Sequence, residues 1–489
     1  MDRAKKKGNT AEPSDPCIRE ALVDMVDRTH PSHVISCMND PETFINGVSD
    51  KLPPDWSVCV MSLVEKHKRF IFSLTRIRKG EPPFHIQTDG NAAKRAIDDH
   101  IAWYEDNISG MKTTDRVLWW TQRRNSHKTL LNIINHMEEK VLSINRGALL
   151  GKLCNQRHQQ QLDKCVDAIV DLLKSINEKS AVETKFIEVY LASWQTFNEA
   201  EKVSAACSFF DQENISNFHL EALVLAFEKA SATLQKSSQK RGHVILVLDK
   251  GLQMLPWETT PTLQPHSVSR VPSVHLLLWQ LQLRGIPSSD QQDLSNASFV
   301  INPKGDLLNT ASRFGDWFNS VQSWKGIVSR PPTQDEWLTS LSRNDVFIFC
   351  GHGAGGAYVQ QEAIARRSAR GVSFLIGCSS GRLTEPGITE PDGMVTWYMM
   401  SGCPSVMSCL WTVTDKDIDK HFATSLLTWA RTGKNLTEII RGCDKVCKHP
   451  LLNGAATVVY GLPVSCTNVP PDLTVNIPDI FKDLSPILS

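Results

Sequence analysis

The second half of the chain alternates short apolar runs with stretches that have helical spacing. Continuous apolar runs of this kind are typical of strands in a parallel sheet that helices cover on both faces. Three stretches between the runs, 334–341, 394–400 and 415–432, have the spacing of helices. The pattern predicts an α/β domain with a mainly parallel sheet. Its strands are expected at 243–249, 298–301, 346–350, 372–376 and 404–409, with a last one at 456–460.

The first half follows a different pattern. Two runs rich in β-branched and aromatic residues, 56–60 and 69–74, predict a small β element. From about residue 91 to 232, apolar positions recur every three or four residues, which predicts long amphipathic helices. Trp119, Trp120 and Trp194 lie in this region and are expected as buried core aromatics.

These patterns divide the chain into four parts. Residues 1–44 are a polar amino-terminal segment, and 45–238 are a largely helical domain with a small β element. A polar and basic linker is expected at 236–241, followed by the α/β domain at 239–466. Residues 467–489 are a Pro-rich tail that is expected to be irregular.

Charge and apolar content exclude two classes of function. The 489 residues include 53 Lys and Arg and 53 Asp and Glu, so no global basic field is available to bind nucleic acid. The sequence has no apolar run of the roughly 18 residues that a membrane span requires. The run Lys5, Lys6 and Lys7 is more typical of a solvated tail than of a nuclear-localisation signal.

The cysteines indicate a reducing compartment. Thirteen of them are scattered singly, and an odd number does not fit a closed disulfide framework. Cys443 and Cys447, with His449 beyond them, lack a second pair of zinc ligands, so core cysteines on a helix are favoured over a metal site. Neither a metal nor another cofactor is expected.

Two predicted strands end in peptides that carry reactive side chains. The strand at 346–350 runs into Gly351, His352 and Gly353, and the strand at 372–376 runs into Gly377 and Cys378. Catalytic groups in open α/β sheets gather at the carboxyl ends of strands, and the 25 residues between His352 and Cys378 allow one crossover between neighbouring parallel strands. The sequence therefore predicts a Cys–His dyad, in which the imidazole increases the thiolate fraction of the cysteine.

The glycines beside the dyad suit an oxyanion hole. Gly353 has no Cβ to block a substrate, so its N–H and that of Cys378 are expected to bind the developing oxyanion. A phosphate-binding loop is the alternative for residues 351–356, but these residues lack both the Lys-Ser/Thr ending of a P-loop and the spacing of a dinucleotide fingerprint.

Several further motifs, together with these two peptides, resemble the carboxy-terminal half of the separases, caspase-like cysteine proteases that open cohesin at anaphase. The similarity extends from about residue 45 to 466, and its upstream part resembles the substrate-binding domain of that family. The matching motifs are Leu52-Pro53-Pro54-Asp55-Trp56, Trp119-Trp120, Leu255-Pro256-Trp257-Glu258, Gly351-His352-Gly353-Ala354-Gly355, Gly377-Cys378-Ser379-Ser380, Ser401-Gly402-Cys403-Pro404, Leu410-Trp411 and Tyr460-Gly461-Leu462-Pro463-Val464.

The resemblance implies a caspase-like fold and peptide-bond hydrolysis after arginine, with Cys378 as nucleophile and His352 as its acid/base partner. Selectivity for arginine requires a carboxylate in the primary pocket, because a guanidinium pairs bidentately with one. Asp415, Asp417 and Asp419 are the candidates, and the resemblance favours Asp419. Residues four apart share a helix face, so Asp415 and Asp419 are expected on one side. The alternative is that these acids only stabilise a helix start.

The resemblance also implies partners. The kleisin subunit of cohesin would be the substrate and securin a pseudosubstrate inhibitor, in the cytoplasm and nucleus. Separases carry a long helical-repeat region upstream of the part seen here, so a separate helical-repeat chain is an expected partner. Two alternatives remain open: a non-catalytic scaffold that holds securin or a helical partner, and another caspase-like protease with a different substrate.

Overall fold

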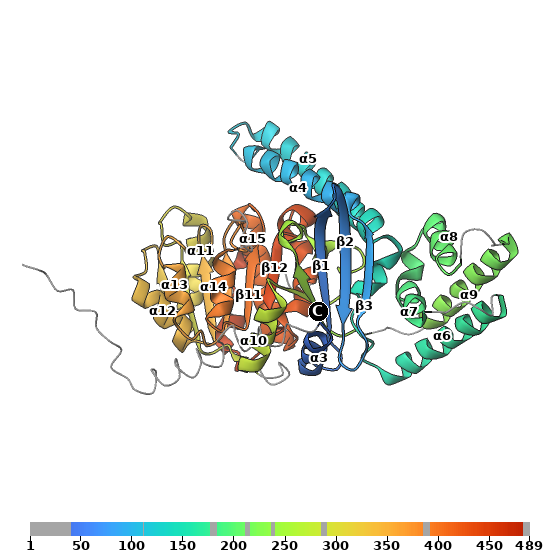
Figure 1. Ribbon diagram of the computed structural model, residues 1–489. Coiled ribbons are helices and arrows are strands. Elements are labelled where there is room, and N and C mark those ends of the chain that lie inside the picture. Colours follow the sequence, from blue (N-terminus) through green and yellow to red (C-terminus); the bar gives the residue numbers. More distant parts are fainter. Residues whose placement is uncertain are drawn as a thin grey trace, which may run out of the picture.

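A single large sheet forms the centre of the computed structural model (Figure 1), which describes residues 41–110, 112–176, 183–210, 216–235, 240–284, 291–384 and 392–482. The sheet has eleven strands in the order β3-β2-β1-β4-β5-β12-β11-β10-β9-β7-β8. Their bounds are β1 Ser57–Lys66, β2 Arg69–Ile77, β3 Phe84–Asp89, β4 Val244–Leu248, β5 Val268–Val271, β7 Ala297–Ile301, β8 Lys325–Val328, β9 Val346–Cys350, β10 Val372–Ile376, β11 Ser405–Cys409 and β12 Thr457–Gly461. Strands β6 Gln291–Asp293 and β13 Ser465–Thr467 form a separate pair.

The predicted α/β class is confirmed. Within the stretch β11-β10-β9-β7-β8 of the sheet, each strand is parallel to the one beside it. Strand β12 pairs with β11 in the antiparallel direction. Every residue of β4, β9, β10, β11 and β12 is buried, as continuous apolar strands require. Helices α14 Met394–Met400 and α15 Asp415–Thr432 coincide with the ranges expected from the sequence.

The small β element of the first half is not separate from this sheet. Strand β1 pairs in parallel with β4, with Cys59 opposite Leu246. The backbone before β4 passes so close to the first half that a Cβ on Gly242 would lie 1.8 Å from the carbonyl oxygen of Asp55, so only glycine fits there. The two halves therefore share one hydrogen-bonded sheet across the expected division near residue 239.

Helices surround the sheet in three groups (Figure 1). Helices α4 Asn91–Gly110 and α5 Arg116–His136 form a long hairpin above it. Helices α6 Gln156–Ile176, α7 Thr184–Ser193, α8 Glu199–Cys207 and α9 Asn217–Gln235 gather beyond β3. The other helices belong to the α/β half and its border: α3 Pro41–Lys51, α10 Val274–Arg284, α11 Leu308–Asn319, α12 Gln334–Arg343, α13 Gln361–Ala365, α16 Leu436–Cys443, α17 Pro471–Val475 and α18 Asp479–Lys482.

Two expectations about the first and last parts were wrong. The described part of the Pro-rich tail, 467–482, is not irregular throughout, because α17 and α18 bury Leu473 and Phe481 against the core. Trp119 and Trp120 are only half-buried, with the guanidinium of Arg123 over the first ring and the ammonium of Lys448 over the second, whereas Trp194 is fully buried.

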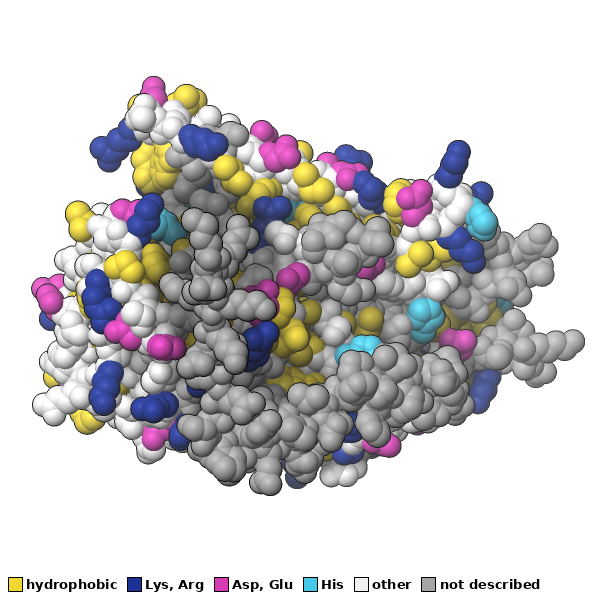
Figure 2. All heavy atoms as spheres, turned by 60° about the vertical axis from the view of Figure 1, so that its left-hand side comes forward, with side chains coloured by type: hydrophobic (Ala, Val, Ile, Leu, Met, Phe, Trp, Pro, Cys, Tyr) yellow, Lys and Arg dark blue, Asp and Glu magenta, His cyan; other side chains and the backbone are white. Residues whose placement is uncertain are grey.

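Two predictions from the sequence concern residues outside the described ranges, namely the Lys5 to Lys7 run and most of the linker expected at 236–241. Among the helices that the structure does describe, none combines the length and the apolar character needed to cross a membrane. On the face shown in Figure 2, basic and acidic side chains are interspersed, in keeping with the balanced charge of the sequence.

Candidate active site

The two glycine-rich peptides meet at the ends of adjacent strands. Strands β9 and β10 are parallel neighbours with Cys350 opposite Ile376, which confirms the predicted pairing. A Cβ on Gly377 would lie 2.2 Å from the carbonyl oxygen of Gly353 and 2.5 Å from that of Gly351. Gly353 itself has a φ of 61°, a conformation that glycine adopts without strain. These glycines let the two loops touch, so the backbones that carry His352 and Cys378 lie side by side.

His352 is oriented by a carboxylate that the sequence analysis missed. Its Nε2 lies 2.9 Å from Oδ1 of Asp306, and its side chain is 55% exposed. Asp306 follows β7, the other parallel neighbour of β9, so it too lies at the carboxyl end of a strand. Hydrogen bonds from Lys304 and then from His352 hold the pKa of Asp306 below its usual range. When Nε2–H donates to Asp306, Nδ1 is the nitrogen that can accept a proton.

Cys378 is a partly buried thiol at the start of a sharp turn. Its Sγ donates to the carbonyl oxygen of Val413 at 3.4 Å. Burial raises the pKa of this thiol, and the negative charge of Asp415 raises it further. Ser379 has a φ of 55°, which costs a non-glycine residue about 1–2 kcal/mol, and its N–H donates to the carbonyl oxygen of Trp411. The resting cysteine is therefore protonated at neutral pH, and it requires a base to become a nucleophilic thiolate.

The α4–α5 hairpin contributes an arginine whose charge acts on Cys378. Arg123 is 1% exposed, and its guanidinium donates to Oδ1 of Asn107 at 2.5 Å and to Oδ1 of Asn453 at 2.9 Å. Asn453 in turn donates to Asp417 at 2.6 Å and to Thr414 at 3.3 Å. Because Thr414 follows Val413, this network ties the hairpin to the segment that accepts the hydrogen bond from Cys378. The positive charge of Arg123 also opposes the effect of burial on the pKa of Cys378.

We expect Arg123→Met to raise the pKa of the Cys378 thiol, because the variant removes the cation that opposes the effect of burial. The diagnostic readout is the pH dependence of Cys378 alkylation by iodoacetamide, followed by mass spectrometry of the peptide. Loss of the cation should move the midpoint to higher pH. Arg116→Met, on an exposed position of the same helix, is the matched control. An alkylation profile identical to that of the parent would show that Arg123 acts on folding alone.

The three candidate carboxylates of the arginine pocket have different surroundings. Asp415 is exposed in the first turn of α15. Asp417 is buried and accepts hydrogen bonds from Asn453 and from the backbone N–H of Lys448. Asp415 and Asp419 interact electrostatically, in keeping with a shared helix face.

Asp419 is the most buried of the three, at 2% exposure. Its Oδ2 accepts hydrogen bonds from Thr310 at 2.9 Å and Arg313 at 2.6 Å, whereas Oδ1 accepts none from the described residues. Burial raises the pKa of Asp419 to about 6, and the bonds from Arg313 and Thr310 counter part of that rise. Asp419 therefore keeps one oxygen for a further donor while a local arginine already holds the other.

The sheet order, the antiparallel last strand and the Cys and His at adjacent strand ends define a caspase-like α/β protein. A family model described as the separin protease domain matches residues 56–418. The chain belongs to this family and carries its protease domain.

Relatives and solved structures agree. Separin of Mus musculus is 31% identical over an alignment of 428 positions, which covers 85% of this chain and 20% of that protein. Separin of Schizosaccharomyces pombe is 27% identical over an alignment of 470 positions, which covers 87% of this chain and 26% of that protein. The crystal structure of the Saccharomyces cerevisiae separase–securin complex matches with a TM-score of 0.73 at 21% identity, over 87% of this chain and 31% of that one. The chain thus spans a fifth to a third of the relatives it matches.

Proposed function

We propose that the chain is a cysteine endopeptidase that cleaves polypeptides after arginine. The observation that carries the proposal is the meeting of the His352 and Cys378 loops at the ends of β9 and β10, with Asp306 on Nε2 of the histidine. A base, its orienting carboxylate and a nucleophile in this arrangement are the components of acyl transfer.

The residues would divide the reaction as follows. Nδ1 of His352 takes the proton of Cys378, and Sγ attacks the substrate carbonyl carbon. The oxyanion is bound by the N–H groups of Gly353 and Cys378. His352 then gives its proton to the departing amine as the peptide C–N bond breaks, which leaves a thioester on Cys378. A water molecule deprotonated by His352 hydrolyses the thioester and restores the thiol.

Asp419 is our choice for the carboxylate that recognises arginine. It lies close enough to Cys350, at the carboxyl end of β9, for its negative charge to add to the effect of burial in raising the pKa of that thiol. Its uncommitted Oδ1 suits a guanidinium N–H, and a buried carboxylate gains most from such a pair. Asp415, by contrast, is exposed, so a pair with arginine there would gain less.

For the substrate we propose the kleisin subunit of cohesin, and for an inhibitory partner securin, in the cytoplasm and nucleus. The support is family membership and the likeness to separase–securin complexes. A scaffold without catalysis is less favoured, because it would have no use for the Asp306–His352 pair beside an intact Cys378.

The function is tested by incubating the full chain with peptides that differ only in one residue, arginine or alanine, before the scissile bond. Cleavage of the arginine peptide alone is expected. Cleavage of neither peptide, with Cys378 still open to alkylation, would favour the scaffold. Cleavage of both would favour a caspase-like protease with another specificity.

Replacing the base or its orienting carboxylate should have graded effects. His352→Ala is expected to lose at least about 10²-fold in kcat, the usual contribution of a positioned acid/base group. Asp306→Asn should lose less and should change the pH dependence of kcat, because the amide no longer fixes the tautomer. Asp335→Asn, an exposed carboxylate in the first turn of α12, is the control. Parental turnover in His352→Ala would assign the base to another residue.

A further inference from the structure

The turn that presents the nucleophile, residues 377–382, is anchored to the sheet on one side; we call it the nucleophile turn. The N–H of Gly381 donates to the carbonyl oxygen of Cys409 on β11 at 2.8 Å, and the N–H of Cys409 donates to Oγ of Ser380 at 3.0 Å. The hydroxyl of Tyr460 on β12 donates to the carbonyl oxygen of Gly381 at 2.9 Å. These bonds fix the part of the turn that faces β11 and β12.

The far end of the nucleophile turn borders a cavity, so packing alone does not hold it there. The cavity has a volume of about 150 Å³, and Arg382 lines it together with Leu410 and Tyr104. Ser379, next to the nucleophile, is half-buried and has a φ of 55°. A non-glycine residue keeps this conformation only where its surroundings enforce it. The turn therefore needs a contact on this side as well.

Tyr104, on helix α4 of the hairpin above the sheet (Figure 1), makes that contact at two points. Its Oη lies 3.4 Å from Oγ of Ser379, and this is the only hydrogen bond that either hydroxyl makes within the described part of the chain. The guanidinium carbon of Arg382 lies 4.1 Å from the centre of the Tyr104 ring, which is a cation–π contact. The N–H of Arg382 donates to the carbonyl oxygen of Ser379 at 3.2 Å, so both contact points belong to one turn.

Helix α4 is itself packed on a residue that the nucleophile turn contacts. The rings of Trp103 and His100 lie with their centres 5.1 and 5.8 Å from that of Trp411, which is fully buried. The carbonyl oxygen of Trp411 accepts the N–H of Ser379 at 3.1 Å. A side chain on a packed helix is placed more precisely than one on a loop. Tyr104 thus has a firm base from which to hold the turn.

We propose that Tyr104 is a positioning residue: it holds the nucleophile turn so that Sγ of Cys378 stays aligned with His352 and the substrate carbonyl. The effect on turnover rests on the proposed function, whereas the hold on the turn does not. The O···O distance of 3.4 Å is long, in keeping with a hydrogen bond that tightens when substrate is bound. The first half of the chain would in this way contribute a residue to the site in the second half.

The test combines turnover with hydrogen exchange in the full chain. Tyr104→Phe removes the hydroxyl and keeps the ring against Arg382. We expect kcat for the arginine peptide to fall about three- to tenfold with KM unchanged, because a hydrogen bond contributes about that much and Tyr104 does not touch the substrate. Amide exchange in the nucleophile turn, measured by mass spectrometry, should be faster by a similar factor. A parental kcat, or parental exchange in the turn, would overturn the proposal.

A double-mutant cycle isolates the contact between the two hydroxyls. Ser379→Ala should lower kcat as much as Tyr104→Phe does, and the double variant should lose no more than either single variant. Losses that multiply in the double variant would refute the pairing. Tyr104→Leu also removes the ring from Arg382 and should lose more than Tyr104→Phe. An equal loss in the two Tyr104 variants would remove Arg382 from the proposed contact.

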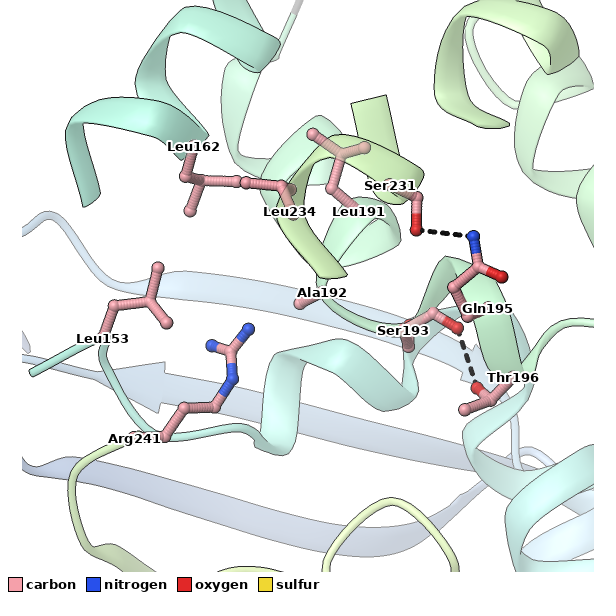
Figure 3. Close-up of a pocket in the computed structure, with 10 residues that line it drawn as sticks. All are labelled: Leu153, Leu162, Leu191, Ala192, Ser193, Gln195, Thr196, Ser231, Leu234 and Arg241. Atoms are coloured by element: carbon pink, nitrogen blue, oxygen red, sulfur yellow. Dashed lines mark hydrogen bonds between the residues drawn. The ribbon is translucent and has the colours of Figure 1, made fainter. Parts of the chain in front are cut away.

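Two control variants keep the test specific. Glu105→Gln changes the next, exposed residue of α4 and should keep parental kcat and exchange. Ala192→Met inserts a larger side chain into a pocket of about 310 Å³ among α6, α7 and α9 (Figure 3), none of whose described lining residues lies on α4. It should also keep parental kcat. A loss in Ala192→Met equal to that in Tyr104→Phe would assign the effect to the first half as a whole and overturn the proposal.

Hydrogen exchange also separates this inference from the proposed function. If the parent cleaves no peptide while Tyr104→Phe still speeds exchange in the nucleophile turn, the peptidase activity is refuted and the hold of Tyr104 on the turn stands. If the parent cleaves the arginine peptide and Tyr104→Phe matches it in kcat and in exchange, the peptidase activity stands and the role of Tyr104 is refuted.

Discussion

Cys378→Ala is expected to abolish hydrolysis of an arginine peptide, a loss of about 10⁴-fold or more in kcat, while the chain still folds. The thiol is the atom that forms the thioester, and no neighbouring side chain replaces it. The side chain is only partly buried and packs on Val413 through one weak hydrogen bond, so alanine leaves little unsatisfied. Steady-state hydrolysis and a thermal unfolding curve measure the two effects.

Cys154→Ala is the matched control, because Cys154 is an exposed thiol in the helical half. It should keep parental turnover. Cys378→Ser tests whether the position needs sulfur and not only a hydrogen-bonding group, and we expect it to be nearly as inactive as the alanine variant. Turnover that persists in both Cys378 variants would refute the mechanism.

Asp419→Asn should lower kcat/KM for an arginine peptide by about 10²- to 10³-fold. The change removes the charge but retains the size and an oxygen for Thr310. A buried guanidinium that loses its carboxylate partner is penalised by about 3–5 kcal/mol. The decisive measurement is the ratio of kcat/KM for an arginine peptide to that for the citrulline peptide, which is neutral and nearly isosteric. That ratio should collapse in Asp419→Asn.

The same ratio depends on pH in a defined direction. Burial raises the pKa of Asp419 to about 6, and the ionised form is the one that pairs with arginine. The preference for arginine should therefore be full above pH 7 and decline as the pH falls through 6.

Because Asp419 also pairs with Arg313, stability must be separated from specificity. Arg313→Met removes the local partner and should keep the preference for arginine over citrulline. Asp415→Asn and Asp417→Asn should alter the ratio less. A collapse of the ratio in one of these two, with a parental ratio in Asp419→Asn, would move the pocket to that residue.

The two strands that lead into the dyad could be predicted from sequence because they are almost entirely apolar and each is followed directly by a glycine. Strand β5 was missed because Arg270 interrupts its apolar pattern, and only the fold shows that Glu258 neutralises this buried arginine. Asp306 could have been found, since it follows the apolar run at 298–301 just as His352 and Cys378 follow theirs.

Arg123 could not have been found in this way. It lies on a helix 255 residues before Cys378, and its effect depends on how the hairpin packs on the loop of Asn453. The expectations for the tail and for the tryptophans of α5 were wrong for a related reason. Whether an apolar residue in a polar context is buried depends on distant segments, and local composition does not contain that information.

The pairing of β1 with β4 means that the two halves are joined by more than the chain that connects them. A nick between α9 and β4 would leave both pieces held together by main-chain hydrogen bonds and the shared core. Deleting the first half would instead expose the edge of β4. The unpaired N–H and C=O groups of this apolar strand would then be available to pair with strands of other chains. The amino-terminal half thus covers, within the same chain, a sheet edge that the protease half would leave exposed by itself.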